Sequence, residues 1–378
     1  MFKRLYVHIP FCLKKCSYCS FVSKVPQQNE QGEYVSLLLA ELHMLSNTTT
    51  EIESIDSLYF GGGTPSLVSA DQISNLIRTA RNRFPLTELT EITLEVNPGT
   101  IVAFSELREA GINRLSLGIQ SFDDRFLNKL GRIHSAESAR HAFQNARSAG
   151  FDNVGIDLIH SLPGQSIAQW QKELEQALLL NPEHLSIYGL TIEEGTPLAQ
   201  QFAAGDLEPT DDDLSADMFE MAYDLLTATG YEHYEIANYA RPGFRSRHNC
   251  GYWQGDGYAG IGVAAHSLLK VGHGIRCSNT TSLDGYQTAI SEGRLPRDSM
   301  LKLSREDAMA EYLFLGLRLT DGVDIETFEG QFNCNFEETY RKKIDSLIGS
   351  GLMELVNGII RLTRRGMLLS NQVFSKFI

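Results

Sequence analysis

The 378-residue sequence has no apolar run long enough to cross a bilayer, and its first residues lack the apolar segment of a signal peptide. It also has no basic excess, because 33 Lys and Arg stand against 47 Asp and Glu, which gives a net charge of -14. Proteins that bind nucleic acid through basic patches do not usually have this balance. We therefore expect a cytoplasmic protein that does not bind nucleic acid.

Cysteine is scarce, but three of the six cysteines, Cys12, Cys16 and Cys19, fall within eight positions. Thiolates hold iron–sulfur clusters, and a cubane cluster normally takes four of them. Because the local run lacks a fourth, one iron would keep an open coordination position. We favour a cluster over a zinc site completed by His8, since no second ligand pair follows downstream, and over a disulfide, which needs an oxidising compartment. The other cysteines lack ligand spacing and are expected to be ordinary buried thiols: Cys250, Cys277 and Cys334.

Hydrophobic residues make up 42% of the chain and charged residues 21%, which is ordinary for a globular protein with a barrel-sized domain and a smaller one. Apolar segments with strand and helix periodicity alternate along the first 230 residues. This alternation predicts parallel βαβ units that form a partial (β/α)6 barrel. The expected strands are 5–9, 57–60, 91–96, 114–119, 153–159 and 184–190, and the expected helices are 31–46, 69–83, 101–110, 135–149, 167–180 and 212–229.

Polar residues and glycines gather where these strands end. The first strand runs into the cysteine loop, and the second runs into Gly61-Gly62-Gly63-Thr64, whose bare N–H groups suit a ligand or a tight turn. Glu95 and Asp157 lie inside apolar strands, where an unpaired carboxylate is costly, so both should have partners such as a ligand's ammonium or ribose hydroxyls. Further polar residues should face the same end of the barrel: Gln120 and Arg132.

Residues 239–262 are rich in Gly, Tyr, Arg and Trp and are predicted to form a long loop or lid. The segment contains His248, which either ligates a haem iron or is hydrogen-bonded within an aromatic cluster. Composition alone favours the second interpretation.

The last part of the chain, 301–378, is predicted to be a helical, winged-helix-like domain after a motif-bearing connector, 236–300, and a core barrel, 1–235. Helices are expected over 304–318 and 336–349. A hairpin of strands 352–354 and 359–362 should turn at Asn357-Gly358. Because this part has no basic excess, we expect a packing or partner surface and no DNA binding.

Six motifs occur in order along this βα chain: the cysteine spacing, GGGTP, EVNPG, GIQSF, LGRIH and GIDLI. Together they resemble the radical S-adenosylmethionine superfamily, and within it the branch of oxygen-independent coproporphyrinogen oxidases and HemW haem chaperones. The resemblance implies that Cys12, Cys16 and Cys19 ligate a [4Fe–4S] cluster whose open iron chelates S-adenosylmethionine. It also implies a set of residues around that ligand, namely Tyr6, Gly62, Gly63, Thr64 and Glu95, and further positions in the same cavity, namely Tyr18, Gln120, Arg132 and Asp157.

Two features distinguish the subfamilies within this branch. The oxidases resemble CxxxCxxCxC, and here Phe21 stands at the last cysteine's position. HemW-like proteins carry an H-N-x-x-Y-W motif implicated in haem binding, which this chain has at 248–253. The resemblance thus favours HemW and makes His248 the candidate iron ligand, with Asn249, Tyr252 and Trp253 shaping the haem site. One departure is Ser161, where the family more often has Gly before Leu-Pro.

The resemblance implies a chaperone that binds haem and delivers it to haem-requiring respiratory proteins. The scaffold is that of radical enzymes, but no coproporphyrinogen oxidase activity is expected. The alternative function is that of the oxidase, which decarboxylates two propionate side chains of coproporphyrinogen III. A homodimer is compatible with the sequence, and delivery of haem to membrane complexes would be consistent with peripheral membrane contact.

Overall fold

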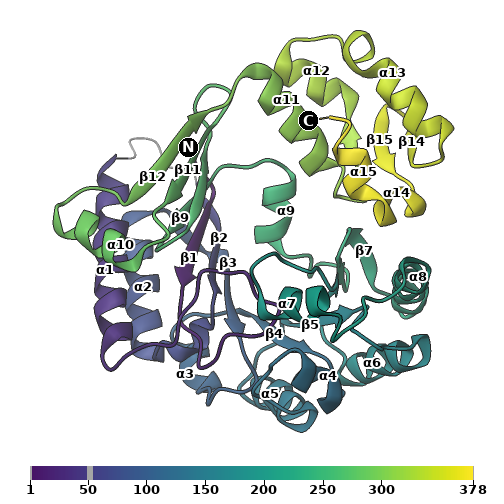
Figure 1. Cartoon of the computed structure of the whole chain (residues 1–378). Coiled ribbons are helices and arrows are strands. Elements are labelled where there is room, and N and C mark those ends of the chain that lie inside the picture. Colours follow the sequence, from purple (N-terminus) through teal and green to yellow (C-terminus); the bar gives the residue numbers. More distant parts are fainter. Residues whose placement is uncertain (1, 49–53, 378) are drawn as a thin grey trace.

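The computed structural model describes residues 2–48 and 54–377. Among these residues, twelve strands form one curved sheet in the order β12-β11-β10-β9-β1-β2-β3-β4-β5-β6-β8-β7 (Figure 1). The six central strands pair in parallel, each with the next along the chain. They are β1 (Arg4–Ile9), β2 (Ile55–Gly62), β3 (Leu86–Val96), β4 (Arg114–Gln120), β5 (Val154–His160) and β6 (His184–Gly189).

Helices cover the convex face of this sheet, and the central strands carry the buried apolar runs typical of parallel sheets (Figure 1). Several of them begin at a serine that forms a capping box, as at Ser69, Ser135 and Ser166. The six predicted βα units are confirmed. The helices of these units are α1 (Glu30–Thr48), α2 (Ala70–Arg83), α3 (Phe104–Glu109), α5 (Ala136–Ser148), α6 (Ile167–Leu180) and α8 (Asp212–Ala228), and two short helices, α4 (Asp124–Lys129) and α7 (Pro197–Ala204), were not predicted.

Further strands extend the sheet on both sides and leave the barrel open between β12 and β7. On one side β9 (Tyr258–Ile261) pairs in parallel with β1, followed by antiparallel β10 (His266–Leu269), β11 (Ile275–Asn279) and β12 (Arg297–Lys302). On the other side β8 (Asn238–Ala240) pairs with β6, and β7 (Glu232–Glu235) pairs with β8. Helix α10 (Leu283–Ser291) lies between β11 and β12 in the chain.

The prediction that 239–262 forms a loop or lid is wrong. This segment contains helix α9 (Arg247–Trp253) and strand β9, and Figure 1 shows α9 beside the open part of the barrel. Its glycines serve close packing: a Cβ at Gly251 would overlap the Arg4 guanidinium, and one at Gly260 would overlap the His266 backbone. The glycine content therefore reflects tight contacts and not a loose chain.

The C-terminal helical domain has its own apolar core, in which the ring of Phe328 contacts those of Phe332, Phe336 and Tyr340. The predicted Asn-Gly hairpin is confirmed, because Asn357 (φ 52°) and Gly358 (φ 81°) are both left-handed. The elements are α11 (Arg305–Gly316), β13 (Val323–Asp324), α12 (Ile325–Phe332), α13 (Phe336–Gly349), β14 (Met353–Val356), β15 (Ile359–Leu362), α14 (Arg364–Leu368) and α15 (Ser370–Phe374).

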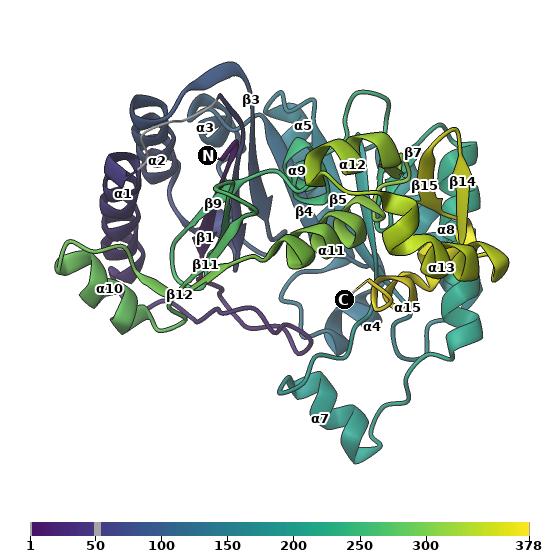
Figure 2. The same ribbon diagram turned by 90° about the horizontal axis from the view of Figure 1, so that it is seen from above.

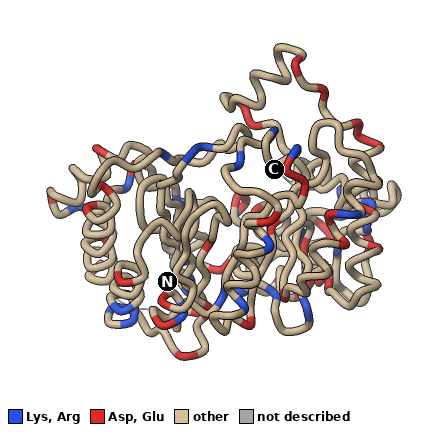
Figure 3. Tube along the Cα trace, turned by 90° about the horizontal axis from the view of Figure 1, so that it is seen from below, with Lys and Arg blue, Asp and Glu red and all other residues tan. Residues whose placement is uncertain are grey.

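Figure 3 shows acidic and basic positions interspersed over the backbone. Within residues 2–48 and 54–377, none of the helices has both the length and the apolar character that a bilayer crossing requires.

Candidate cluster and cofactor site

The cysteine loop leaves β1 at the carboxyl ends of the parallel strands and is held by backbone hydrogen bonds. The loop returns on itself, since Lys24 N–H donates to Pro10 O (2.8 Å) and Cys12 N–H donates to Lys24 O (2.9 Å). Ser17 then connects it to two neighbours: Ser17 N–H donates to Leu130 O (3.0 Å), and the N–H of Leu198 in α7 donates to Ser17 O (2.8 Å). Figure 2 shows α7 extending from the body on the side of this loop.

The three predicted thiols line one cavity of about 510 Å³ at this end of the barrel. Thr64 Oγ1 donates to Cys12 Sγ (3.6 Å), and Arg132 Nη1 donates to Cys16 Sγ (3.5 Å). Burial raises the pKa of the Cys12 and Cys19 thiols. Among the described residues, no three His, Cys, Asp or Glu side chains converge on a single-ion site. Three half-buried thiols with donors aimed at two of them fit a larger cluster of irons.

The glycine turn after β2 is pressed against the exit of β1. Gly63 N–H donates to Ile9 O (2.8 Å) and Thr64 N–H to Phe11 O (2.7 Å), and a Cβ on Gly63 would lie 2.7 Å from Phe11 O. Gly62 has φ 107° and faces the His8 ring. The glycines are thus required by backbone packing, and they also bring the turn, which continues into the 3-10 helix η1 (Pro65–Leu67), to the cavity edge.

The two carboxylates inside strands have partners within the protein, as their burial requires. Glu95 accepts hydrogen bonds from the Tyr59 hydroxyl (2.8 Å) and from Gly62 N–H (3.2 Å). Ser116 Oγ lies 3.1 Å from both oxygens of Asp157. Burial raises the pKa of Glu95 to about 7 and also raises that of Asp157. Both line the cavity and can accept bonds from a cationic or hydroxyl-bearing ligand.

Arg132 and Gln120 complete the polar wall beside the thiols. Arg132 Nη2 donates to Gly118 O (2.6 Å), while its buried Nε has no partner among the described residues. Gln120 has φ 68°, an uncommon backbone conformation for a residue other than glycine, at the end of β4. Both line the cavity together with Tyr18 and Asn249, so twelve of the sixteen predicted site residues meet there, and the others are Tyr6, His248, Tyr252 and Trp253.

His248 lies behind the cavity wall and is only 1% exposed. Its Nδ1 lies 2.8 Å from Ser57 Oγ, its Nε2 lies 2.8 Å from the Tyr252 hydroxyl, and its ring stacks on Tyr59 at 4.9 Å. Burial, followed by the charges of Arg4 and Arg114, holds its pKa well below the usual range. Both ring nitrogens are therefore occupied. In this conformation His248 does not fit as a haem ligand, and binding iron would first require Tyr252 or Ser57 to leave.

The other two residues outside the cavity are packed as well. The Trp253 ring lies under the Arg318 guanidinium at 4.2 Å, which joins α9 to the C-terminal domain. The Tyr6 hydroxyl bonds His8 Nδ1 (3.1 Å), and His8 Nε2 bonds Val22 O (3.0 Å), so His8 is also fully occupied. Of the scattered cysteines, Cys277 is buried as expected, whereas Cys250 and Cys334 are half-buried.

Sequence reasoning missed several polar residues that line the cavity floor. Side chains two apart on a strand share a face, so Arg114 and Ser116 follow from Gly118 and Gln120 on β4. Arg114 is buried, and its Nε has no partner among the described residues. The alternation of side chains along a strand could therefore have predicted the missed cavity residues. They are Tyr59, Arg114, Ser116, Ser186 and Tyr188.

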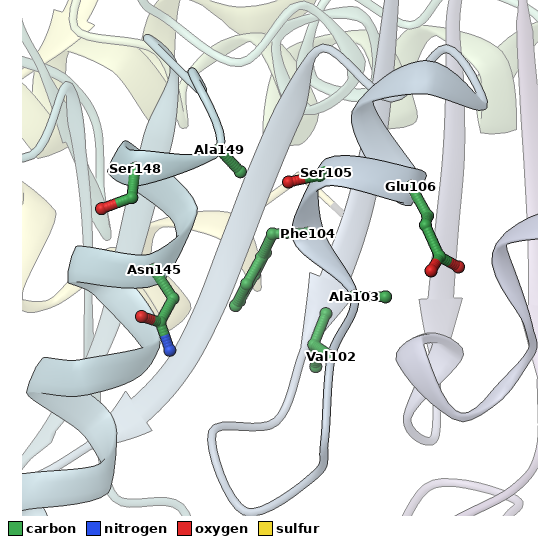
Figure 4. Close-up of a pocket in the computed structure, with 8 residues that line it drawn as sticks. All are labelled: Val102, Ala103, Phe104, Ser105, Glu106, Asn145, Ser148 and Ala149. Atoms are coloured by element: carbon green, nitrogen blue, oxygen red, sulfur yellow. The ribbon is translucent and has the colours of Figure 1, made fainter.

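A second hollow, of about 400 Å³, lies on the outer surface between α3 and α5. Glu106 is its only ionisable lining residue, and Figure 4 shows that carboxylate turned away from Asn145 and Ser148. We assign no chemistry to it.

A parallel βα sheet with a CxxxCxxC loop at the strand ends is the arrangement that the resemblance to radical S-adenosylmethionine proteins predicts. The family model described as the radical SAM superfamily matches residues 6–177, and that described as the HemN C-terminal domain matches residues 303–369.

Relatives that match the chain over nearly its full length show to which family within this superfamily it belongs. The chain is 36% identical to heme chaperone HemW of Lactococcus lactis (99% of this chain, 96% of the relative) and 35% identical to heme chaperone HemW of Escherichia coli (99% and 97%). Its structure resembles that of coproporphyrinogen III oxidase (HemN) from Escherichia coli, with a TM-score of 0.85 and 26% identity over 100% of this chain and 90% of that one. The chain belongs to the HemW family of radical S-adenosylmethionine proteins.

Proposed function

We propose that this protein is a haem chaperone of the HemW type, which binds a [4Fe–4S] cluster, S-adenosylmethionine and haem and delivers the haem to respiratory haem proteins from the cytoplasm. The observation that carries the proposal is Phe21, which stands where the related oxidases have a cysteine, in a chain matched end to end by relatives named heme chaperone HemW. The supporting geometry is the cavity at the strand ends.

In this proposal, Cys12, Cys16 and Cys19 hold the cluster, which when bound supplies an iron that can chelate the amino and carboxylate groups of S-adenosylmethionine. Arg132 stabilises the thiolate of Cys16 through its charge-assisted hydrogen bond. Gly62, Gly63, Thr64 and Glu95 form one wall around the ligand. Tyr18, Gln120 and Asp157 form the other, and Tyr6 supports the first wall from behind.

The role in binding iron that the resemblance implies for His248, with Asn249, Tyr252 and Trp253 around it, stays a prediction, and the bonds at both ring nitrogens do not favour it. It requires a rearrangement of α9 in which the Tyr252 hydroxyl leaves Nε2. Asn249, which already lines the cavity, is the motif residue best placed to contact a ligand.

The alternative function is oxygen-independent coproporphyrinogen III oxidase, favoured by the structural likeness to that enzyme. Incubation of the anaerobically reconstituted protein with coproporphyrinogen, S-adenosylmethionine and reductant should yield no protoporphyrinogen. Phe21→Cys, which restores the CxxxCxxCxC spacing, is the matched variant. Robust product from the unaltered chain would replace the chaperone proposal with the enzyme.

The chaperone proposal is tested by haem titration of the same reconstituted protein. We expect a saturable Soret band at one haem per chain and its loss when an apo-haem protein is added, because a chaperone must release its cargo. The absence of saturable binding, or retention of haem in the presence of every acceptor tested, would contradict the proposal.

A further inference from the structure

The cysteine loop carries apolar side chains that face solvent at the mouth of the cavity. Phe21 is 62% exposed and Leu13 is 49% exposed, and Phe21 itself lines the cavity. Isolated exposed apolar residues are normal, but a concentration on one loop marks a binding surface. Two further apolar residues on the loop are also exposed, Val22 and Val25.

Two lysines stand beside this apolar surface in a chain whose net charge is -14. Lys14 and Lys15 line the cavity mouth, and Lys15 Nζ donates to Phe21 O (3.1 Å), which places the ammonium next to the aromatic residue. Within the described part of the chain, neither lysine has an acidic partner in a hydrogen bond or ion pair, although Glu193 lines the same cavity. No carboxylate of the described chain therefore competes with an anionic ligand for these charges, and Lys15 also lies near the Cys19 thiol.

We propose that haem binds at this rim, defined as Leu13, Lys14, Lys15 and Phe21, with its ring edge on the apolar side chains and its propionates on the lysines. The inference rests on the proposed function and locates its cargo. It also accounts for His248, which is packed behind the wall with both ring nitrogens bonded. In this assignment His248 is a positioning residue for Tyr59, on which it stacks, and not the iron ligand.

The chemistry of the rim matches haem in particular. Haem is a flat apolar ring with two carboxylates on one edge, and the rim offers an exposed aromatic ring and two lysines that are consecutive in the chain. A membrane surface would need a broader basic area, and the rim lies at the mouth of a concave cavity that also contains Glu193. In this proposal Phe21 contacts the haem ring, and it stands at the position where the oxidases have a cysteine.

The test is a hemin titration of the full, anaerobically reconstituted chain. The variants are Lys14→Glu/Lys15→Glu and, separately, Phe21→Ser. The matched controls are Lys342→Glu/Lys343→Glu, an exposed lysine pair on α13, and Leu179→Ser, which alters a residue that is 84% exposed on α6. We expect each rim variant to weaken hemin binding about tenfold, because an ion-paired edge or an aromatic contact is lost, and the controls to leave it unchanged. Cluster absorbance should stay the same throughout.

A modified ligand and a salt series test the proposed contact between the lysines and the haem propionates. The double lysine variant should weaken hemin binding but leave hemin dimethyl ester, which lacks the carboxylates, unaffected. For the unaltered chain, hemin binding should weaken as salt rises, because salt screens exposed charges. His248→Gln, which retains polar groups for Ser57 and Tyr252, should bind hemin with unchanged affinity and Soret position.

The outcomes are distinguishable. Rim variants that bind hemin as tightly as the unaltered chain would overturn the rim assignment. That result would not contradict the proposed chaperone function. Loss of the Soret shift in His248→Gln alone would overturn it in favour of the histidine. An unaltered chain without saturable hemin binding would overturn the proposed function and the rim assignment with it.

Discussion

The cysteine loop and helix α9 both carry motifs that resemble functional ones, yet their surroundings differ sharply. The loop is half-exposed, its thiols line a cavity, and two of its thiols accept hydrogen bonds from Thr64 and Arg132. In α9, His248 is 1% exposed and bonded at both nitrogens. Within one motif, His248 thus supports the cavity wall from behind, whereas Asn249 lines the cavity.

The largest expected effect comes from the cysteine loop, and it tests whether the three thiols hold a cluster. Replacement of Cys12, Cys16 and Cys19 by Ala should abolish the cluster's absorbance after reconstitution, because no thiolate remains to hold iron. The melting temperature of the apo protein should change little, since the thiols make only weak contacts. Cys250→Ala/Cys334→Ala is the matched control, and it should load a normal cluster. Equal loss of absorbance in both proteins would contradict the loop assignment.

The next effect tests whether α9 is structural. His248→Ala should lower the free energy of unfolding by about 2 kcal/mol, because it leaves a cavity and unpairs the hydroxyls of Ser57 and Tyr252. Urea denaturation of the apo protein measures this loss. His248→Gln, which can still bond both hydroxyls, should lose less than half as much. A His248→Ala variant as stable as the original would show that α9 does not depend on the histidine.

Glu95 lies where the two regions meet, because its partner Tyr59 stacks on His248. Burial raises its folded-state pKa to about 7, above the value in the unfolded chain. The folded state therefore binds more protons between about pH 4.5 and 7, and stability falls as pH rises through this window, by on the order of 3 kcal/mol.

Glu95→Gln should flatten this part of the stability profile, measured by urea unfolding of the apo protein at several pH values. Glu106→Gln, at the hollow between α3 and α5, is the control and should preserve the profile. A Glu95→Gln profile with the original slope would assign the pH dependence to other groups.

The smallest effect concerns Ser161, which has φ 60° and bonds His160 Nδ1 (2.8 Å) and Ser215 Oγ (2.7 Å). Ser161→Gly relieves the strain of the left-handed backbone but removes both hydrogen bonds. The two effects oppose each other, so the free energy of unfolding, followed by the melting temperature, should change by less than about 1 kcal/mol. Ser161→Ala removes the bonds and keeps the strain, and it should be the less stable of the two. The reverse order would show that the backbone is not strained there.

The spacing of hydrophobic residues was enough to predict the six βα units, because a buried face repeats apolar residues at the period of a helix or a strand. The Asn-Gly pair was enough to predict the hairpin. The cysteine loop, the glycine turn and four polar residues of the cavity also followed from their places at strand ends, namely Glu95, Gln120, Arg132 and Asp157. Tyr18 and Asn249 followed only from the family resemblance. The environment of His248 could not be predicted, since Ser57 lies 191 residues away in the chain. The glycines of α9 and β9 predict a loop when the sequence is taken alone, because the neighbours that require them, Arg4 and His266, are known only from the fold. The domain boundaries at 235 and 300 stay a prediction.

The pairing of β1 has a consequence for how the protein matures. Strand β1 lies between β2 and β9, so one edge of the N-terminal strand has no neighbour until residues 258–261 have been synthesised. Pairing across such a sequence separation is slow, because a long loop must close first. The cysteine loop that follows β1 also depends on later residues, because Ser17 bonds Leu130 and Leu198, so we expect its final geometry to form only after about half of the chain has been made.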